Sequence, residues 1–466
     1  GKLQPGDVFG QYMDGDIWRI DLQSGKEQKI ISNGFNPAFS PDGKLIALDA
    51  SWAGPRRIWV VNNHGSNPQQ ITGDVSEAVS HVNPGWSPDG KKIVFQNIER
   101  TKFDIKVVEI FSRKVEWITN DLFQDLNPIW SGHYIYFSSY RSGGLNIWRI
   151  PANGSGSPQQ LTIGAGQDVQ IAISPDEQQL AFTILRQNAD IWKLEISSHT
   201  GEPVNAPSSV IVSTREDSRG SWSPDGSHIA FNSDRTGDMN IWKYSLADEK
   251  IEQLTKGPGG DYQPNWSPDG NWITFFSCRA GNADIWLIDS NGNHLKRLTK
   301  TKSLEINPFF SPDGKQIAYQ SDESGRLEIW LMNHDGSDQR QISDIGVMGH
   351  FLKWSTDGKF IFFRCSSGNQ SVMKIPVDGG EPIDLAEVAG GSHISFSPDQ
   401  SMIMDVIGHK QLWVSPLTAG KPKMIFEFDN PDARIDYPMW SPDGKCILFD
   451  KFQPQGGDIW IMKNFE

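Results

Sequence analysis

The chain has 466 residues, with 57 aspartate and glutamate residues against 43 lysine and arginine residues, so its formal net charge is −14. Because binding to phosphate backbones depends on clustered lysine and arginine, and no such cluster is present, this composition disfavours a nucleic-acid-binding protein. Glycine (45), proline (28) and tryptophan (18) are abundant, which is typical of many short strands joined by tight turns.

One phrase recurs along the whole chain and marks it as a repeat protein. Its first copy, NPAFSPDGKLIAL from Asn36, is followed by NPGWSPDGKKIVF from Asn83 and by further copies up to YPMWSPDGKCILF from Tyr437. The serine of each copy serves as a marker, and consecutive markers are 42 to 49 residues apart: Ser40, Ser87, Ser131, Ser174, Ser223, Ser267, Ser311, Ser355, Ser397 and Ser441. Four-stranded units of this length are the signature of propeller blades.

Each unit is expected to contain four strands. The first ends at the marker serine, is turned by Pro-Asp-Gly and continues into an alternating apolar strand such as KIVFQN. A loop such as SDRTGD leads to a third strand carrying Ile-Trp, and a turn such as DSNGN leads to the fourth. Fifteen of the 18 tryptophans stand before the marker serine or in the third strand, so we expect them to pack in the core and between blades.

The predicted fold is all-β: a single closed β-propeller over residues 1–466, with about ten four-stranded blades. The blades are expected to begin near residues 35, 82, 126, 169, 218, 262, 306, 350, 392 and 436. Residues 1–31 supply closing strands that pair with the last strands, so that the two termini seal the ring. This arrangement leaves one third-type strand over, and eleven partial blades or two abutting smaller propellers are the alternatives.

The phrase SPDGK-x-IAF, followed by Asp-Ile-Trp and then by Gln-Leu-Thr, resembles the WD-repeat-like propeller family typified by TolB and the propellers of prolyl-oligopeptidase-type enzymes. The resemblance covers essentially the whole chain. It implies a bacterial protein in the periplasm or outside the cell, either alone or as the sensor part of a longer receptor. It leaves the function open, because such blades serve as binding platforms, peptidase gates and enzyme bodies.

Acidic residues form a second regularity, six positions before the marker serine in five consecutive units: Asp125, Asp168, Asp217, Asp261 and Glu305. In an antiparallel blade they share a face with the loop after the second strand, which carries Arg141, Arg186, Arg235 and Arg279. We predict the within-blade pairs Asp125–Arg141, Asp168–Arg186, Asp217–Arg235 and Asp261–Arg279. These charges either select a partner at the rim or, as we favour, lock each blade.

The seventh unit departs from this pattern. Glu305 faces Asp322 and Glu323, and no arginine stands at the paired position. Three carboxylates at one rim suit a hard cation such as Ca²⁺ or a basic residue of a partner. The simpler expectation is that water solvates these carboxylates or that nearby Arg326 neutralises them. We therefore expect no cofactor and keep calcium as an alternative.

Three histidines precede first strands, namely His81, His350 and His393. On the channel-facing rim they could converge as metal ligands or as a general acid and base. Oligogalacturonate-lyase propellers, which are similar in repeat style, use a histidine-rich metal centre. However, the three histidines do not share one register, so the resemblance gives an enzyme only as an alternative.

The sequence favours a non-catalytic binding scaffold or sensor module that recognises a protein, peptide or glycan on the loop rim or in the central channel. The alternative is a metal-dependent polysaccharide lyase or hydrolase. The expected binding rim comprises Asp125, Asp168, Asp217, Asp261, Glu305, Asp322, Glu323, His81, His350 and His393. No run of about 18 apolar residues is present, so we expect no membrane insertion, and we expect a monomer.

Overall fold

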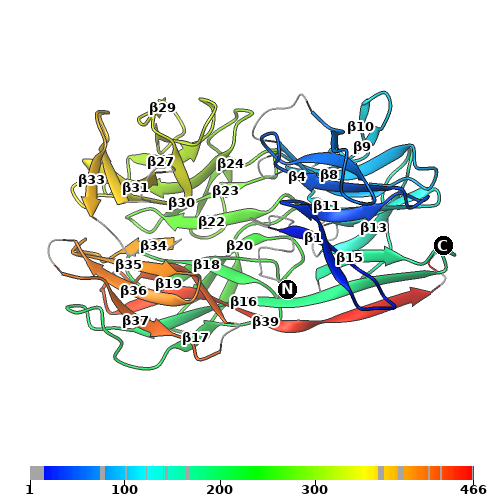
Figure 1. Cartoon of the computed structure of the whole chain (residues 1–466). Helices are drawn as coiled ribbons and strands as arrows, with labels where there is room; N and C mark the ends of the chain where they lie inside the picture. Colours follow the sequence, from blue (N-terminus) through cyan, green and yellow to red (C-terminus); the bar gives the residue numbers. More distant parts are fainter. Residues whose placement is uncertain are drawn as a thin grey trace. The chain divides into compact units, whose positions relative to one another are not determined.

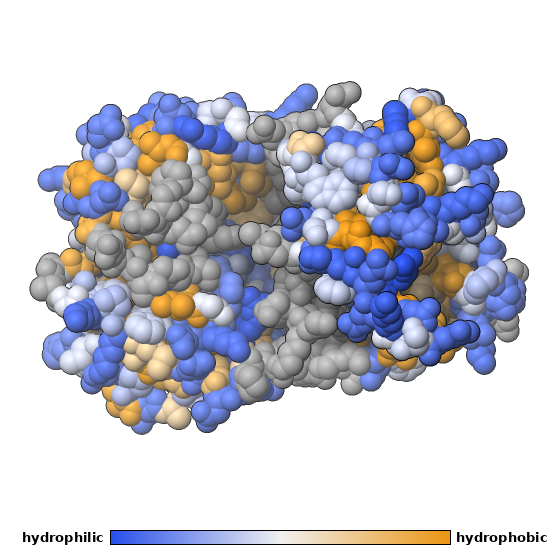
Figure 2. Space-filling view, in the orientation of Figure 1, coloured by the Kyte–Doolittle hydropathy of each residue, from blue (hydrophilic) through white to orange (hydrophobic). Residues whose placement is uncertain are grey.

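The computed structural model describes residues 15–73, 79–99, 102–121, 123–139, 141, 145–163, 167–365, 372–386, 393–417, 420–430, 433–463 and 465 (Figure 1). Within these ranges the named secondary-structure elements are all β-strands, and no helix there could cross a membrane. Figure 2 shows polar residues over most of the described surface in view, with apolar residues in separate patches.

The chain forms two compact units. The first comprises Gly1–Arg186 with Gly456–Glu466, and the second comprises Gln187–Gln455. The expected single ring of about ten blades is therefore not confirmed. Constant repeat spacing does not distinguish one large ring from two smaller units, because each blade has the same length in either case.

Most strands of the first unit form four-stranded antiparallel sheets in sequence order. These sheets are β3 to β6 (Phe35–Phe39, Leu45–Ala50, Arg57–Asn62, Gln69–Gln70), β7 to β10 (Val79–Trp86, Lys92–Glu99, Lys102–Glu109, Val115–Trp117) and β11 to β14 (Asp125–Ser131, Tyr134–Ser139, Asn146–Pro151, Gln159–Gln160). β1 (Asp16–Ile20) and β2 (Glu27–Ser32) form a separate two-stranded sheet. β15 (Gln167–Ile173) pairs with the beginning of β16 (Gln179–Glu195).

The second unit contains five sheets of four sequential strands. They are β18 to β21 (Asp217–Trp222, His228–Ser233, Asn240–Ser245, Ile251–Gln253), β22 to β25 (Asp261–Trp266, Trp272–Ser277, Asp284–Asp289, Lys296–Arg297), β26 to β29 (Glu305–Phe310, Gln316–Ser321, Glu328–Asn333, Arg340–Gln341), β30 to β33 (Val347–Trp354, Phe360–Cys365, Val372–Pro376, Ile383–Ala386) and β34 to β37 (His393–Phe396, Met402–Ile407, Gln411–Pro416, Lys423–Glu427). A sixth sheet takes strands from both ends of this unit's sequence. Its strand order is β15, β16, β39 (Cys446–Lys463) and β38 (Arg434–Trp440), and β17 (Ser208–Ile211) also pairs with β16.

This sixth sheet corrects the expected role of residues 1–31. The last strands pair with β16, whereas β1 and β2 pair with each other among the described strands. The reason lies in β16 itself, which runs through 17 residues without a turn. Where other units have a Gly-containing loop such as SDRTGD, this one has RQNAD, so β16 continues without a turn and pairs with β15, β17 and β39.

The marker serine and its turn are held by the same hydrogen bonds in sheet after sheet. In the turn after β18, Ser223 Oγ donates to Asp225 Oδ1 at 2.5 Å and accepts from the His228 amide at 2.9 Å. Gly226 has a φ of 71°, a conformation that glycine adopts without strain. The turn aspartates therefore have a structural role.

Apolar residues pack mainly between neighbouring sheets. One core cluster joins Ile241 and Leu254 of one sheet to Ile273 and Phe275 of the next. Trp266 lies in the same cluster, and its indole Nε1 donates to the Ser221 carbonyl of the preceding sheet at 3.1 Å. The tryptophan before the marker serine thus connects adjacent sheets by both packing and a hydrogen bond.

The first strands of the six sheets in the second unit, β18, β22, β26, β30, β34 and β38, contact one another in that order, and β38 also contacts β18. Most of these strands carry a bulge four residues before the marker serine, where Arg219, Gln263, Asn307 and Tyr437 have positive φ values of 50° to 56°. A bulge bends the strand and redirects a side chain. These strands and their bulges form the lining described next.

Candidate functional site

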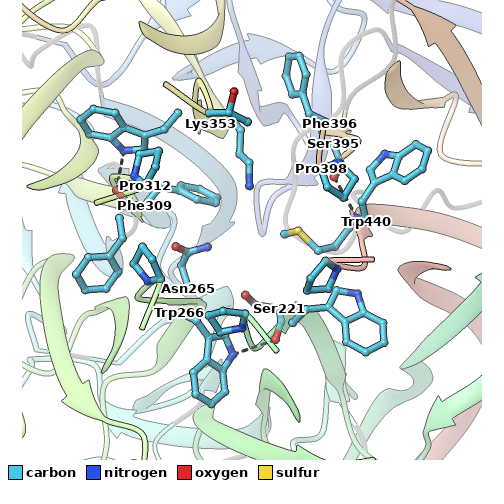
Figure 3. Close-up of a pocket in the computed structure, with 18 of the residues that line it drawn as sticks. Ser221, Asn265, Trp266, Phe309, Pro312, Lys353, Ser395, Phe396, Pro398 and Trp440 are labelled. Atoms are coloured by element: carbon cyan, nitrogen blue, oxygen red, sulfur yellow. Dashed lines mark hydrogen bonds between the residues drawn. The ribbon is translucent and has the colours of Figure 1, made fainter. Parts of the chain in front are cut away.

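A cavity of about 360 Å³ lies among the six first strands of the second unit (Figure 3). Each sheet contributes to it the residue two positions before its marker serine, and we call this set layer B: Ser221, Asn265, Phe309, Lys353, Ser395 and Met439. The residues four positions before the serine line the same channel together with layer B, and we call them layer A: Arg219, Gln263, Asn307, Phe351, His393 and Tyr437. The repeat therefore converts two sequence positions into two layers of a channel.

Lys353 is the charged member of layer B. Figure 3 shows its side chain extending from β30 toward the middle of the cavity, with Asn265 and Ser221 across from it. Burial lowers the pKa of its amine, and among the described residues no carboxylate forms an ion pair with it. A lysine amine that extends into a cavity without a carboxylate partner attracts an anionic group.

Two histidines and an aspartate meet at the His393 position of layer A. His393 begins β34, His409 lies in the turn between β35 and β36, and Asp436 lies in β38 of the neighbouring sheet. Asp436 Oδ1 lies 3.0 Å from His393 Nδ1 and 2.5 Å from His409 Nδ1. Burial opposes ionisation of Asp436, but the hydrogen bonds from both histidines outweigh it and lower the pKa of this carboxyl to about 2.

The surroundings of this cluster are charged and buried. The His393 ring packs against the Tyr437 ring with centroids 4.0 Å apart, and Tyr437 Oη accepts a hydrogen bond from Arg219 at 2.6 Å. Burial lowers the pKa of His393. Burial also raises the pKa of Asp450 well above its usual range, although the Arg219 amide donates to that carboxylate.

Three of the four acid–arginine pairs expected from the sequence are present. Arg141 pairs with Asp125, Arg235 with Asp217 at 2.5 Å and Arg279 with Asp261. The Arg186 side chain lies outside the described residues, so the fourth pair stays a prediction, and Asp168 accepts a hydrogen bond from the Thr162 hydroxyl. All four aspartates are buried, so they are not an exposed rim, and this favours their structural role over contact with a partner.

Arg326 of the seventh unit pairs with carboxylates other than the three that it was expected to neutralise. Arg326 pairs with Glu328 at 2.6 Å and with Asp344 at 2.8 Å. Glu305 is buried and accepts a hydrogen bond from the Thr301 hydroxyl. Burial, with a smaller contribution from nearby carboxylates, raises the pKa of Glu305 to about 7.

Asp322 and Glu323 are the two other carboxylates expected beside Glu305. Asp322 Oδ1 accepts the Leu304 amide at 2.8 Å. Among the described residues, the one group of three histidine, cysteine or carboxylate side chains whose ligand atoms lie within 4.8 Å of one another is His393, His409 and Asp436. A calcium site at Glu305, Asp322 and Glu323 stays a prediction.

The three histidines expected to converge lie in different parts of the chain, and their convergence stays a prediction. His81 belongs to the first unit, is 2% exposed and packs against Phe95 with ring centroids 4.8 Å apart. Burial lowers the pKa of His81 to about 3, so this ring is neutral at physiological pH and is part of the core. His393 belongs to the second unit, and the His350 side chain lies outside the described residues.

The sequence also matches a known family model. Residues 75–217, 208–292 and 258–414 match the model of the TolB β-propeller domain, and together these ranges cover more than half of the chain. The chain belongs to the TolB β-propeller domain family. This confirms the resemblance inferred from the SPDG and Asp-Ile-Trp motifs.

Relatives of this TolB-family chain share low identity with it. It is 27% identical over 243 residues to an uncharacterised protein of Agrobacterium fabrum, a match that covers 48% of this chain and 80% of that protein. TolB from Acinetobacter baumannii is 17% identical with a TM-score of 0.41, over 82% of this chain and 80% of that one. An oligogalacturonate lyase in complex with manganese is 12% identical with a TM-score of 0.31, over 95% and 97% of the two chains. Both TM-scores are below 0.5, so the assignment to the TolB family rests on the sequence match.

Sequence reasoning missed Lys353 and His409, although the repeat of this TolB-family chain contains a signal for each. Two positions before the marker serine, Lys353 is the one charged residue among the ten units. Twelve positions after the marker serine, where other units carry Arg235 or Arg279, the ninth unit carries His409. Aligning the ten units on these positions would have identified both residues.

Proposed function

We propose that this chain is a non-catalytic binding scaffold whose second unit, a closed six-bladed propeller, takes up a carboxylate-bearing segment of a protein or peptide in its channel. Lys353 carries the proposal. Its amine extends into the cavity, burial lowers its pKa, and the described residues supply no carboxylate to neutralise it. A ligand carboxylate would complete this site with a charge-assisted hydrogen bond.

The remaining members of layer B support a polypeptide ligand. Asn265, Ser221 and Ser395 supply hydrogen-bonding groups, whereas Phe309 and Met439 supply apolar surface. Ligand channels typically combine mostly apolar walls with a few polar groups that fix orientation. This combination suits an extended segment that ends in, or carries, a carboxylate.

Closure of the second unit supports a rigid scaffold. The six first strands contact one another in a cycle, and the sixth sheet takes strands from both ends of the unit's sequence. Such a sheet would seal the ring and remove exposed strand edges. We also propose a periplasmic or extracellular location, on the basis of membership in the TolB β-propeller domain family.

The test uses the full chain and a peptide library presented in two forms, with a free C-terminal carboxylate and with a C-terminal amide. We expect selected peptides to bind through a carboxylate, and the substitution Lys353→Met to weaken them at least about tenfold, which corresponds to ~1.4 kcal/mol. Lys359→Met, at an exposed position in the turn that follows β30, is the matched control and is expected to leave binding unchanged. Equal affinity of the Lys353→Met variant for these peptides would overturn the proposal.

The metal-dependent polysaccharide lyase or hydrolase is the second candidate, because one observation favours it. His393 and its neighbours His409 and Asp436 form a cluster of metal-ligand type beside the channel. Eliminase activity on acidic oligosaccharides that requires a metal and is abolished by His409→Ala would favour this candidate. Retained peptide binding without such activity favours the scaffold.

A further inference from the structure

The cluster of His393, His409 and Asp436 differs chemically from the acid–arginine pairs of the second unit. Asp217 and Asp261 are each neutralised by an arginine, which keeps its charge at any relevant pH. Asp436 faces two imidazoles instead. An imidazole supplies a positive charge only when it is protonated, so this carboxylate lacks the permanent counter-charge of its counterparts.

The geometry suits one cation shared by the three residues. The contacting atoms are two imidazole nitrogens and one carboxylate oxygen, and their ligand atoms lie within 4.8 Å of one another. Ligands placed about 2.0 to 2.2 Å from one transition-metal ion lie roughly 3 Å or slightly more apart. The His393 Nδ1 to Asp436 Oδ1 distance of 3.0 Å fits this spacing, whereas His409 Nδ1 at 2.5 Å must move back slightly.

The structure allows that movement. His409 lies in a turn, and its side chain is 35% exposed, whereas the side chains of His393 and Asp436 are each 8% exposed. The two buried ligands are thus fixed by two adjacent sheets, and the third can adjust. Two histidines and one carboxylate form a ligand set used by zinc and by non-haem iron.

We propose that His393, His409 and Asp436 bind one divalent transition-metal ion, with Zn²⁺ as the reference ion, at the layer A end of the channel. His393 lines the channel as well as belonging to the cluster, so the bound ion would lie beside the channel. Sites with three protein ligands and one open position bind water or a ligand group in the fourth position. The proposal does not depend on Lys353 or on the peptide ligand.

The experiment is calorimetric titration of the chelator-treated full chain with ZnCl₂, followed by replacement with Co²⁺. We expect one Zn²⁺ per chain with a dissociation constant in the micromolar range or below. We also expect visible absorption bands of Co²⁺ in a site with nitrogen and oxygen ligands. His409→Ala should weaken Zn²⁺ binding by about 100-fold or more, because a ligand itself contributes at least as much as its supporting residues.

Two controls keep the test decisive. His294→Ala removes an exposed histidine that also contacts a carboxylate, Asp289, at 2.8 Å, and it should leave the high-affinity site unchanged. Asp436→Asn keeps the side-chain shape and removes the charge, and it should also abolish that site while circular dichroism verifies the fold. Absence of stoichiometric Zn²⁺, or stoichiometric Zn²⁺ that persists in both His409→Ala and Asp436→Asn, would show that the cluster is only a hydrogen-bonded network.

Discussion

Glu305 is a buried carboxyl whose ionisation should destabilise the second unit. It is 1% exposed, and its pKa is about 7, against an ordinary value of 4.5. Below pH 4.5 the carboxyl is protonated in both the folded and the unfolded chain. Between pH 4.5 and about 7 it ionises in the unfolded chain only, so the folded state binds more protons and stability falls as the pH rises.

The expected size of this effect follows from the two pKa values. Their separation corresponds to about 3 kcal/mol, most of which is lost between pH 5 and pH 8. Glu305→Gln cannot ionise, and its Oε1 can still accept the Thr301 hydroxyl. The free energy of unfolding of the variant, relative to the wild type, should therefore rise by roughly 2 to 3 kcal/mol over this pH range.

Differential scanning calorimetry at pH 5, 6, 7 and 8 measures this difference. At about 2 °C or more per kcal/mol, the melting temperature of the variant relative to the wild type should increase by roughly 5 °C from pH 5 to pH 8. Glu252→Gln is the control, because Glu252 pairs with Lys250 and Lys243 and its pKa is lowered. Parallel melting curves for Glu305→Gln and the wild type across this range would refute the reasoning.

Two further predictions concern the sheets of the second unit. Arg235→Ala leaves Asp217 buried without its cation, so it should destabilise the unit by about 3 to 5 kcal/mol, and Asp217→Asn in the same chain should restore part of the loss in urea denaturation. Trp266→Phe removes the hydrogen bond to the Ser221 carbonyl and should cost about 1 kcal/mol. Trp222→Phe is its control, because no hydrogen bond to the Trp222 indole nitrogen is found among the described residues, and equal losses in both variants would contradict the role of the bond.

The sequence predicts the individual sheets well because their signals are local. The Ser-Pro-Asp-Gly turn, the alternating second strand and the acid–arginine pairs are each set within one unit of about 44 residues. Asp217 and Arg235, for example, lie 18 residues apart and meet in one hairpin. Such contacts follow directly from antiparallel pairing.

The division into two units could not be predicted in the same way. It depends on β16 and β39, which run on where other units turn, and on which distant strand each of them pairs with. A strand contains the same alternation of apolar residues whichever sheet it joins. Spacing therefore predicts the blades but not the partner of a long strand.

The residues that give the channel its chemistry can be recognised in the sequence only where one unit differs from the others. The positions that build the turn and the sheet contacts hold nearly the same residues in every unit, because each sheet needs the same turn and the same packing. The positions of layers A and B have no such requirement, since they face the cavity, and in the second unit they range from serine to phenylalanine, lysine and histidine. Lys353 adds an amine there that forms no ion pair among the described residues, and His409 stands where other units carry Arg235 or Arg279. Because both residues lie at or beside the channel, this is where a binding function is best sought.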